Sequence, residues 1–279
     1  MFNLFRVIQI QTRTNCNRRC EFCANSYIKH SAPRQMDDKL FQSIIIQLKN
    51  MGFNGRISPY LMNEPLLDNN LESKINYIKK MCPKAHIRIN SNGDMLSTER
   101  LKSLFESGMD GLIVDCYDSL SQFKEMIAMA KNALTIYPDI AVQPSFDIRI
   151  LPIAQKYVRV CDCSDYGKNS SYLTNMAGIV PRNIGGKLPL KRSCFTIFEQ
   201  MYINYRGDVI LCCQDWNFDV IVGNAKKDSL QDIWMGESLT HYREKLLDGD
   251  RKKLLLCSTC DAASEDDNAT SENDTNYLK

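Results

Sequence analysis

The hydrophobic positions in the first half of the chain follow two periods in turn, a period of two that is typical of strands and a period near 3.6 that is typical of helices. Phe5 to Thr12 shows the first, because Ile8 and Ile10 alternate with glutamines. Asp37 to Met51 shows the second, with acidic residues at the end where negative charge suits the helix dipole. The same succession predicts further strands at 56–61, 85–91, 111–116, 140–143 and 157–161, and further helices through Leu71 to Ile78, Leu101 to Phe105 and Ser121 to Leu134.

This strand-then-helix order predicts a parallel sheet with right-handed crossovers, built either as a barrel or as a doubly wound sheet. Pro144 and Pro152 interrupt its last two strands. In both architectures the functional loops follow the C-terminal ends of the strands. We therefore expect an α/β protein whose chemistry lies in those loops.

A second unit is expected after residue 165. From Gly167 to Pro189 the composition turns to Gly, Asn, Ser and Pro, which is typical of a connector. Beyond it, residues 206–208 read Arg-Gly-Asp between two short apolar runs and predict a hairpin. Ser229, with Asp232 three residues on, forms a near capping box for a short helix. The acidic, polar tail at 262–279 is expected to be disordered.

The composition limits the class of protein. The chain has 279 residues, of which 44% are apolar and 24% charged, values typical of one large globular domain or two ordinary ones. A net charge of +2 argues against a nucleic-acid surface, which would carry a basic excess. No apolar run approaches the ~20 residues that cross a bilayer, and the first residues lack a signal-peptide core. We therefore expect a cytoplasmic protein that has no membrane partner.

Twelve cysteines in a cytoplasmic protein point to metal or redox sites wherever their spacing is short. Cys16, Cys20 and Cys23 form a C-x3-C-x2-C array just after the first strand. Three thiolates hold a four-iron cubane with one iron left open, whereas a structural zinc would need a fourth ligand. The nearest histidine, His30, lies outside zinc-finger spacing. Zinc and unligated core cysteines stay as alternatives to an iron-sulfur site.

This cysteine spacing, with the aromatic Phe22 before the third cysteine, resembles the radical S-adenosylmethionine (SAM) superfamily. The resemblance implies a partial (β/α) barrel of about five to six parallel strands over residues 1–165. It implies a [4Fe-4S] cluster whose open iron chelates SAM, with Phe22 among the cofactor-binding residues, and a flavodoxin- or ferredoxin-type reductant. Reduction of that cluster would cleave SAM to a 5'-deoxyadenosyl radical that abstracts a hydrogen atom.

Four cysteines in the last third of the chain could close a second metal site, either a structural zinc or a second iron-sulfur cluster. They are Cys194, Cys212, Cys257 and Cys260. With the runs L-C-C-Q-D and S-L-Q-D-I-W and the final C-x2-C, they resemble the SPASM/twitch extension of radical SAM enzymes. The resemblance implies a small α+β domain over 166–261 with one auxiliary [4Fe-4S] cluster. Cys213 is left over, and strand alternation would put it on the opposite face from Cys212.

The same resemblance assigns residues to SAM. Asn63-Glu64 occupies the place of the family's G-G-E motif, which binds the SAM amino group, although both glycines are replaced here. Asn90, Ser91 and Asn92 end the third strand, where the family contacts the ribose or methionine part of SAM. From the residues alone, a helix-start carboxylate is the less favoured alternative for Glu64, whereas a simple turn explains the asparagine-rich stretch equally well.

Asp115 and Cys213 are the candidate catalytic residues. Asp115, together with Tyr117, ends the fourth strand and would face the pocket of a barrel. Cys213 is a thiol that could return a hydrogen atom to a substrate radical. Cys82 and Cys116 are isolated along the chain and fit packing roles.

The whole pattern is similar to the twitch-bearing aminocyclitol dehydrogenases of aminoglycoside biosynthesis, the 2-deoxy-scyllo-inosamine dehydrogenase-like enzymes. The similarity implies that a small polar, sugar or aminocyclitol-like substrate is oxidised, with the auxiliary cluster accepting the electron. One departure is T-N-M-A-G, where those enzymes read S-N-R-G-G, so that Met176 replaces an arginine that contacts substrate. The alternatives are a maturase of ribosomally made peptides, an epimerase with a cysteine hydrogen donor, and a zinc-stapled binding protein.

Overall fold

The structure, a computed structural model, describes residues 4–29, 31–145, 156–169, 173–181 and 188–262. The described strands are β1 (Val7–Ile10), β2 (Arg56–Ser58), β3 (His86–Ser91), β4 (Gly111–Cys116), β5 (Ile140–Ser145), β6 (Lys156–Asp162), β7 (Gln200–Ile203), β8 (Asp208–Ile210) and β9 (Ile221–Asn224). They form one sheet in the order β5-β6-β4-β3-β2-β1-β7-β8-β9. The pairs from β5 across to β7 are parallel, and the last two pairs are antiparallel.

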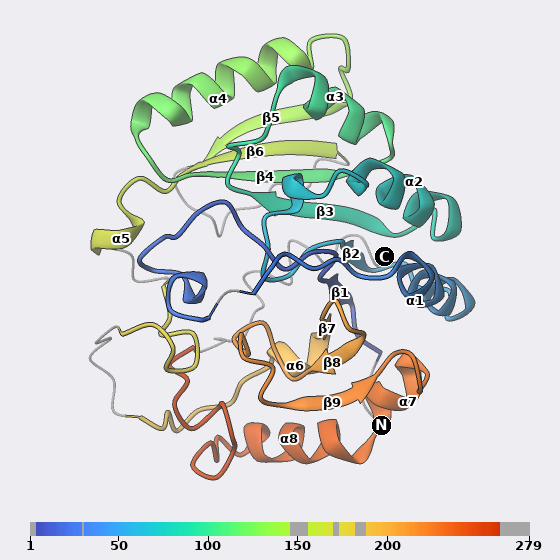
Figure 1. The fold of residues 1–279 in the computed structure, drawn as a ribbon, viewed down its shortest axis with the longest axis vertical. Helices are drawn as coiled ribbons and strands as arrows, with labels where there is room; N and C mark the ends of the chain where they lie inside the picture. The colour runs from blue at the N-terminus through green and yellow to red at the C-terminus, as the bar shows by residue number, and fades with distance from the viewer. Residues whose placement is uncertain (1–3, 30, 146–155, 170–172, 182–187, 263–279) are drawn as a thin grey trace.

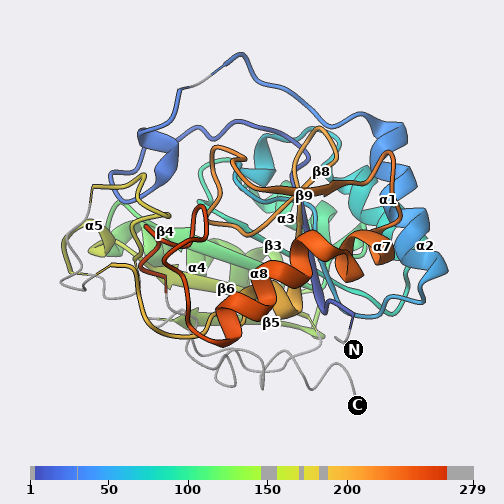
Figure 2. The same ribbon diagram turned by 90° about the horizontal axis from the view of Figure 1, so that it is seen from below.

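Helices connect the parallel strands in the predicted order. The described helices are α1 (Asp38–Asn50), α2 (Leu71–Met81), α3 (Thr98–Glu106), α4 (Leu120–Ala133), α5 (Tyr166–Asn169), α6 (Thr196–Glu199), α7 (Leu230–Met235) and α8 (Glu237–Leu247), with 3-10 turns η1 (Ala24–Ser26) and η2 (Pro65–Leu67). Figure 1 shows α1 to α4 in an arc outside the sheet. In Figure 1 α8 lies below β9, and in Figure 2, seen from below, it lies in front of the sheet. None of these helices has the length and apolar character that a membrane span needs.

Short polar side chains set where the helices begin. Asp37 accepts a hydrogen bond from the Leu40 amide at 3.1 Å and caps α1. Ser229 caps α7, since its hydroxyl accepts from the Asp232 amide at 3.0 Å and donates to the Asp232 carboxylate at 2.6 Å. Such caps satisfy amides that have no partner within the helix. The capping pair predicted at residues 229–232 is therefore confirmed.

The main core lies between the parallel strands and α1 to α4. Alternation along each strand sends one set of side chains to this core and the other set to the opposite face. The core set is aliphatic and fully buried, as Ile57, Ile87, Ile89, Leu112 and Val114 show. The opposite face carries polar residues where the strands end, and it is this face that the functional loops frame.

The C-terminal unit continues the sheet of the first unit. β7 pairs in parallel with β1, with Val7 opposite Gln200 and Ile10 opposite Ile203. Local periodicity predicts each strand but not this pairing, because the partners lie far apart in sequence. β9 is a short strand that sequence analysis missed. The boundary near residue 165 stays a prediction, and residues 263–279 of the expected tail lie outside the described residues.

The core predicts a sharp contrast between two isoleucines of α1. Ile44 is fully buried, whereas Ile46 is 41% exposed. We expect Ile44→Ala to lower the free energy of unfolding by about 2–5 kcal/mol, because it leaves a cavity. The matched Ile46→Ala should change it by less than about 0.5 kcal/mol. Urea unfolding followed by circular dichroism measures both, and equal losses would contradict the assigned core.

Candidate functional site

The three N-terminal cysteines lie in the loop between β1 and α1, at the edge where the parallel strands end. The loop is held by its own polar groups. The Cys23 amide donates to the Cys20 carbonyl at 3.0 Å, and the Ser26 hydroxyl donates to the same carbonyl at 2.7 Å. The Asn25 side chain donates to the Arg18 carbonyl at 2.9 Å. These bonds turn the loop back on itself, so that its three thiols line one cavity.

That cavity brings together residues from four strand ends. All the residues predicted to contact SAM line it, with the three cysteines and one predicted catalytic residue: Cys16, Cys20, Phe22, Cys23, Asn63, Glu64, Asn90, Ser91, Asn92 and Asp115. Arg18 and Trp216 also line it and were missed by sequence analysis. The parallel register explains the convergence, since loops that follow neighbouring strands meet at one edge of the sheet.

Glu64 connects two of these loops. Its carboxylate accepts from the Leu66 amide at 2.9 Å, which caps η2, and from the Ser91 hydroxyl at 2.7 Å. It also accepts from the Asn92 amide at 2.9 Å. Burial raises the pKa of Glu64 above its ordinary value, while these three donors act in the opposite direction. Glu64 therefore caps the start of η2 and also lines the wall of the cavity.

The donor set fits an iron-sulfur cluster with a bound cofactor. Burial raises the pKa of Cys16 and Cys23, and raises that of Cys20 to about 11, so a cation must replace the protons before the sulfurs act as thiolates. The Nδ2 group of Asn63 is buried and has no hydrogen-bond partner in the described part of the chain. A buried, unpaired donor in a cavity wall fits an acceptor on a bound molecule, such as the carboxylate of SAM.

Asp115 is the last residue but one of β4 and lies on the polar face of the sheet. The Cys163 thiol lies 3.8 Å from its Oδ1 atom, and Cys161 also hydrogen-bonds the carboxyl group. Burial is the largest cause that raises the pKa of Asp115, to about 6, with a smaller effect from the charge of Glu64. The carboxyl group can therefore exchange a proton near neutral pH inside the cavity.

The second cysteine set lines a separate cavity. Its walls include the four predicted ligands and the fifth thiol: Cys194, Cys212, Cys213, Cys257 and Cys260. Arg251 lies beside them, 2% exposed, and donates to the carbonyls of Arg192, Ser193 and Ala262. It thus ties the segment before Cys194 to the segment after Cys260. Nothing in the local sequence singles out Arg251, because its partners are backbone atoms of distant residues.

Strand alternation does not separate Cys212 from Cys213, because β8 ends at Ile210 and both cysteines lie in the turn that follows. The Gln214 amide donates to the Cys212 sulfur at 3.2 Å. Cys213 has a lowered pKa because of hydrogen bonds with Cys212 and, to a smaller extent, with Tyr202. Cys213 therefore lies beside Cys212 of the second cysteine set and beside Tyr202 of β7.

The same turn reaches the first cavity through Trp216. Asp215 is fully buried and accepts from the Asp219 amide at 2.8 Å and from the Val220 amide at 2.9 Å. These bonds fix the turn so that Cys212 lines one cavity and Trp216 the other. An aromatic residue four positions after an expected ligand was the available signal, but only the folded turn shows which cavity it reaches.

Comparison with known proteins decides the family. Residues 10–131 match the model of the Radical SAM superfamily, and residues 194–261 match SPASM, an iron-sulfur cluster-binding domain. Over 265 residues the chain is 30% identical to the S-adenosyl-L-methionine-dependent 2-deoxy-scyllo-inosamine dehydrogenase of Niallia circulans, covering 95% of this chain and 96% of that protein. The chain belongs to the radical SAM superfamily.

Solved structures of this family share the fold. The crystal structure of BtrN in complex with AdoMet and 2-DOIA matches with a TM-score of 0.76 and 28% identity, covering 95% of this chain and 96% of that one. BtrN in an open conformation matches with a TM-score of 0.67 and 25% identity, over 95% of both chains. The expected α/β fold class and the SPASM extension are confirmed. The resident cofactors are SAM and iron-sulfur clusters, and the zinc alternative is wrong.

The two cavities predict how iron divides between the cysteine sets. We expect about eight irons per chain in the anaerobically reconstituted protein, because each set would hold one four-iron cluster. Cys23→Ala should leave about four irons and abolish SAM cleavage, whereas Cys257→Ala should leave about four irons and keep it. Iron and sulfide analysis with an assay for 5'-deoxyadenosine measures both. The control is Cys82→Ala, which removes a buried thiol that lines neither cavity and should keep about eight irons. Loss of SAM cleavage in Cys257→Ala but not in Cys23→Ala would contradict the assignment.

Proposed function

We propose that this enzyme oxidises a carbinol group of a small polar, aminocyclitol-like substrate to a ketone. Bound SAM and its cluster supply a 5'-deoxyadenosyl radical for the carbinol hydrogen atom, and the auxiliary cluster supplies the acceptor for one electron. The hydroxyl proton then has to go to a base of the protein, so that one hydrogen atom, one proton and one electron leave the substrate. The relative in Niallia circulans, whose name describes such a dehydrogenase, supports this reaction over nearly the whole of both chains.

The turn between Cys212 and Trp216 is the observation that carries the proposal. It contributes to the cavity of the SAM-binding loop and to the cavity of the second cysteine set. An oxidation that loses a single electron needs an acceptor close to the substrate radical, and a cluster with four protein thiolates has no open iron for a substrate. One fixed turn that contributes a residue to each of the two cavities therefore favours oxidation.

We assign Asp115 as the base that accepts the hydroxyl proton. Its carboxyl group lines the cavity, is oriented by the Cys163 thiol, and has a pKa close to the pH at which cytoplasmic enzymes work. The titratable groups that face it come from the neighbouring elements and are Cys161, Cys163, Tyr117, Tyr166, Tyr60 and Glu64. We also propose that the enzyme works in the cytoplasm with a flavodoxin- or ferredoxin-type reductant.

The T-N-M-A-G stretch supports a substrate that differs from 2-DOIA. Met176 and Ala177 have φ angles of 47° and 54°, a left-handed backbone that is strained for residues with a Cβ atom. Thr174 donates to Gln214 at 2.9 Å, and Asn175 donates to the Thr259 carbonyl at 2.8 Å, so the stretch is fixed beside the auxiliary cysteines. An apolar Met176 at this place would not recognise the polar group that an arginine contacts.

Epimerisation is a second candidate function. Cys213 lines the second cavity, but it lies in the same turn as Trp216, which lines the first, and a thiol in that turn could return a hydrogen atom to the substrate radical. The two functions differ in product, because epimerisation conserves the oxidation state of the substrate. They are therefore separated by the products that one reaction forms.

The test of the proposed function uses the anaerobically reconstituted enzyme with dithionite and SAM and, in separate reactions, 2-deoxy-scyllo-inosamine (2-DOIA) and related amino alcohols and polyols. We expect one of the alcohols other than 2-DOIA to give a ketone together with an equal amount of 5'-deoxyadenosine, both measured by mass spectrometry. A substrate epimer that carries deuterium from heavy water would favour epimerisation. Formation of 5'-deoxyadenosine without any change in this amino alcohol or in related polyols would refute the proposal.

Replacement of Asp115 tests the base. Asp115→Asn should lower ketone formation by a factor of about 10²–10⁴, because the proton acceptor is lost, while SAM cleavage continues without product. In the wild-type enzyme the rate of ketone formation should fall as the pH drops below about 6, where Asp115 becomes protonated. The control is Cys116→Ala, the next residue of β4, which packs into the helix-side core. An unchanged pH profile in Asp115→Asn would rule out this role.

A further inference from the structure

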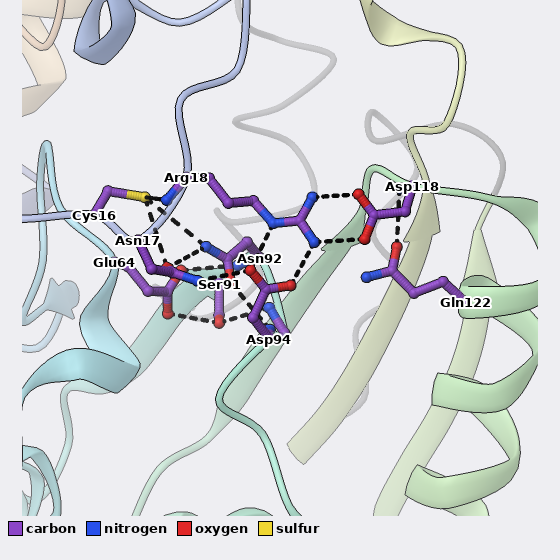
Figure 3. Close-up of polar contacts among 10 residues, drawn as sticks. Cys16, Asn17, Arg18, Glu64, Ser91, Asn92, Asp94, Asp118 and Gln122 are labelled. Atoms are coloured by element: carbon purple, nitrogen blue, oxygen red, sulfur yellow. Dashed lines mark hydrogen bonds and ion pairs between the residues drawn. The ribbon is translucent and has the colours of Figure 1, made fainter.

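Arg18 lies between two cysteines of the first set and bonds two carboxylates at once. Its Nε atom donates to Oδ2 of Asp94 at 2.7 Å, and its Nη2 atom donates to Oδ1 of the same residue. Its Nη1 and Nη2 atoms donate to the carboxylate oxygens of Asp118 at 2.6 and 2.7 Å. Figure 3 shows the guanidinium group between the two carboxylates. We call this arrangement the Arg18 clasp.

The two carboxylates come from neighbouring strand ends. Asp94 follows β3 and Asp118 follows β4, and these strands are paired in register, with Ser91 opposite Val114. Each aspartate is held by its own backbone: the Asp94 amide donates to Asn92 Oδ1, and the Asp118 amide donates to Gln122 Oε1, both at 3.0 Å. The clasp therefore attaches the cysteine loop to two fixed points of the sheet.

A second path joins the clasp to the residues expected to bind SAM. Asn17 donates to Asp94 at 2.7 Å and accepts from the Asn92 side chain at 2.9 Å. The same side chain lies 3.8 Å from the Cys16 sulfur, and the Asn92 amide donates to Glu64. Figure 3 shows these bonds as one connected network from Asp118 to Glu64. A displacement of the loop would therefore change the position of the thiols relative to the cofactor wall.

The geometry of the clasp indicates that it orients the cysteine loop more than it stabilises the fold. The side chains of Arg18, Asp94 and Asp118 are 17%, 23% and 62% exposed, and ion pairs in contact with water contribute little to folding. A guanidinium group that bonds two carboxylates fixes direction as well as distance, which a lysine cannot do. Reactions between bound groups depend strongly on such placement, where an error of about 1 Å costs about 10²-fold in rate.

We propose that Arg18 is a positioning residue, which holds the cysteine loop against the ends of β3 and β4 and so sets where SAM binds relative to the loop. The inference rests on SAM binding in this cavity and is independent of the alcohol that the enzyme oxidises. Neither carboxylate partner was indicated by the sequence, because Asp94 and Asp118 lie 76 and 100 positions away from Arg18.

The test replaces Arg18 in the full, reconstituted enzyme. Arg18→Lys keeps the charge but loses the planar guanidinium group that bonds both carboxylates. We therefore expect unchanged iron content and SAM binding weakened on the order of tenfold. Asp118→Asn should weaken SAM binding in the same direction, and it leaves the Asp94 bonds in place. The matched control is Arg19→Lys, because Arg19 is exposed and donates to the backbone carbonyls of Cys16 and Arg18.

Three readouts decide the outcome without an alcohol substrate: the dissociation constant for SAM, the change that SAM causes in the electron paramagnetic resonance spectrum of the reduced cluster, and amide exchange of residues 15–26 in the protein without iron. We expect weaker binding, a smaller spectral change and faster exchange in Arg18→Lys and Asp118→Asn, but not in Arg19→Lys. Wild-type values in both clasp variants would overturn the proposal. If Arg18→Lys does not bind iron, the same three measurements on Asp118→Asn decide whether the proposal holds.

Discussion

The parallel pairing of β1 with β7 holds the two cysteine sets in one rigid frame. β1 leads directly into the loop of Cys16, and β7 leads through the hairpin to Cys212. Bonds beyond the ladder extend the pairing at both ends: the Arg6 amide donates to the Glu199 carbonyl at 2.8 Å, and the Gln11 amide donates to the Ile203 carbonyl at 2.9 Å. The separation between the two cysteine sets is therefore set by backbone geometry.

The two cavities differ in charge in a way that suits their contents. The first combines the carboxyl groups of Glu64 and Asp115 with three thiols, and its guanidinium group, Arg18, is already paired with carboxylates. Such a cavity favours positive ligands, namely iron and the sulfonium and amino groups of SAM. The second places the buried cation of Arg251 beside four thiols, where it balances the negative charge of a fully ligated cluster.

Sequence patterns predicted features that depend on near neighbours. The helix over α1, the bounds of β4 at residues 111–116 and both cysteine sets follow from periodicity or short spacing, and the structure has them there. The β1–β7 pairing, the Arg18 clasp and the reach of Trp216 could not be predicted, because each joins residues that are distant in sequence and ordinary in type. The sequence identifies residues that could interact, whereas only the structure shows which of them are in contact.

The departure from the G-G-E motif has a physical explanation in the fold. Met62, at the first glycine position, is 5% exposed and packs with Tyr202 and Ile210 of the C-terminal unit. Asn63, at the second, lines the first cavity, and its Nδ2 group is buried without a hydrogen-bond partner among the described residues. The first replacement thus adds apolar contact across the β1–β7 junction, and the second adds a side-chain donor in the wall of the cavity. Glu64 keeps its place because its bonds to Ser91 and Asn92 depend on the strand ends and not on the two preceding residues.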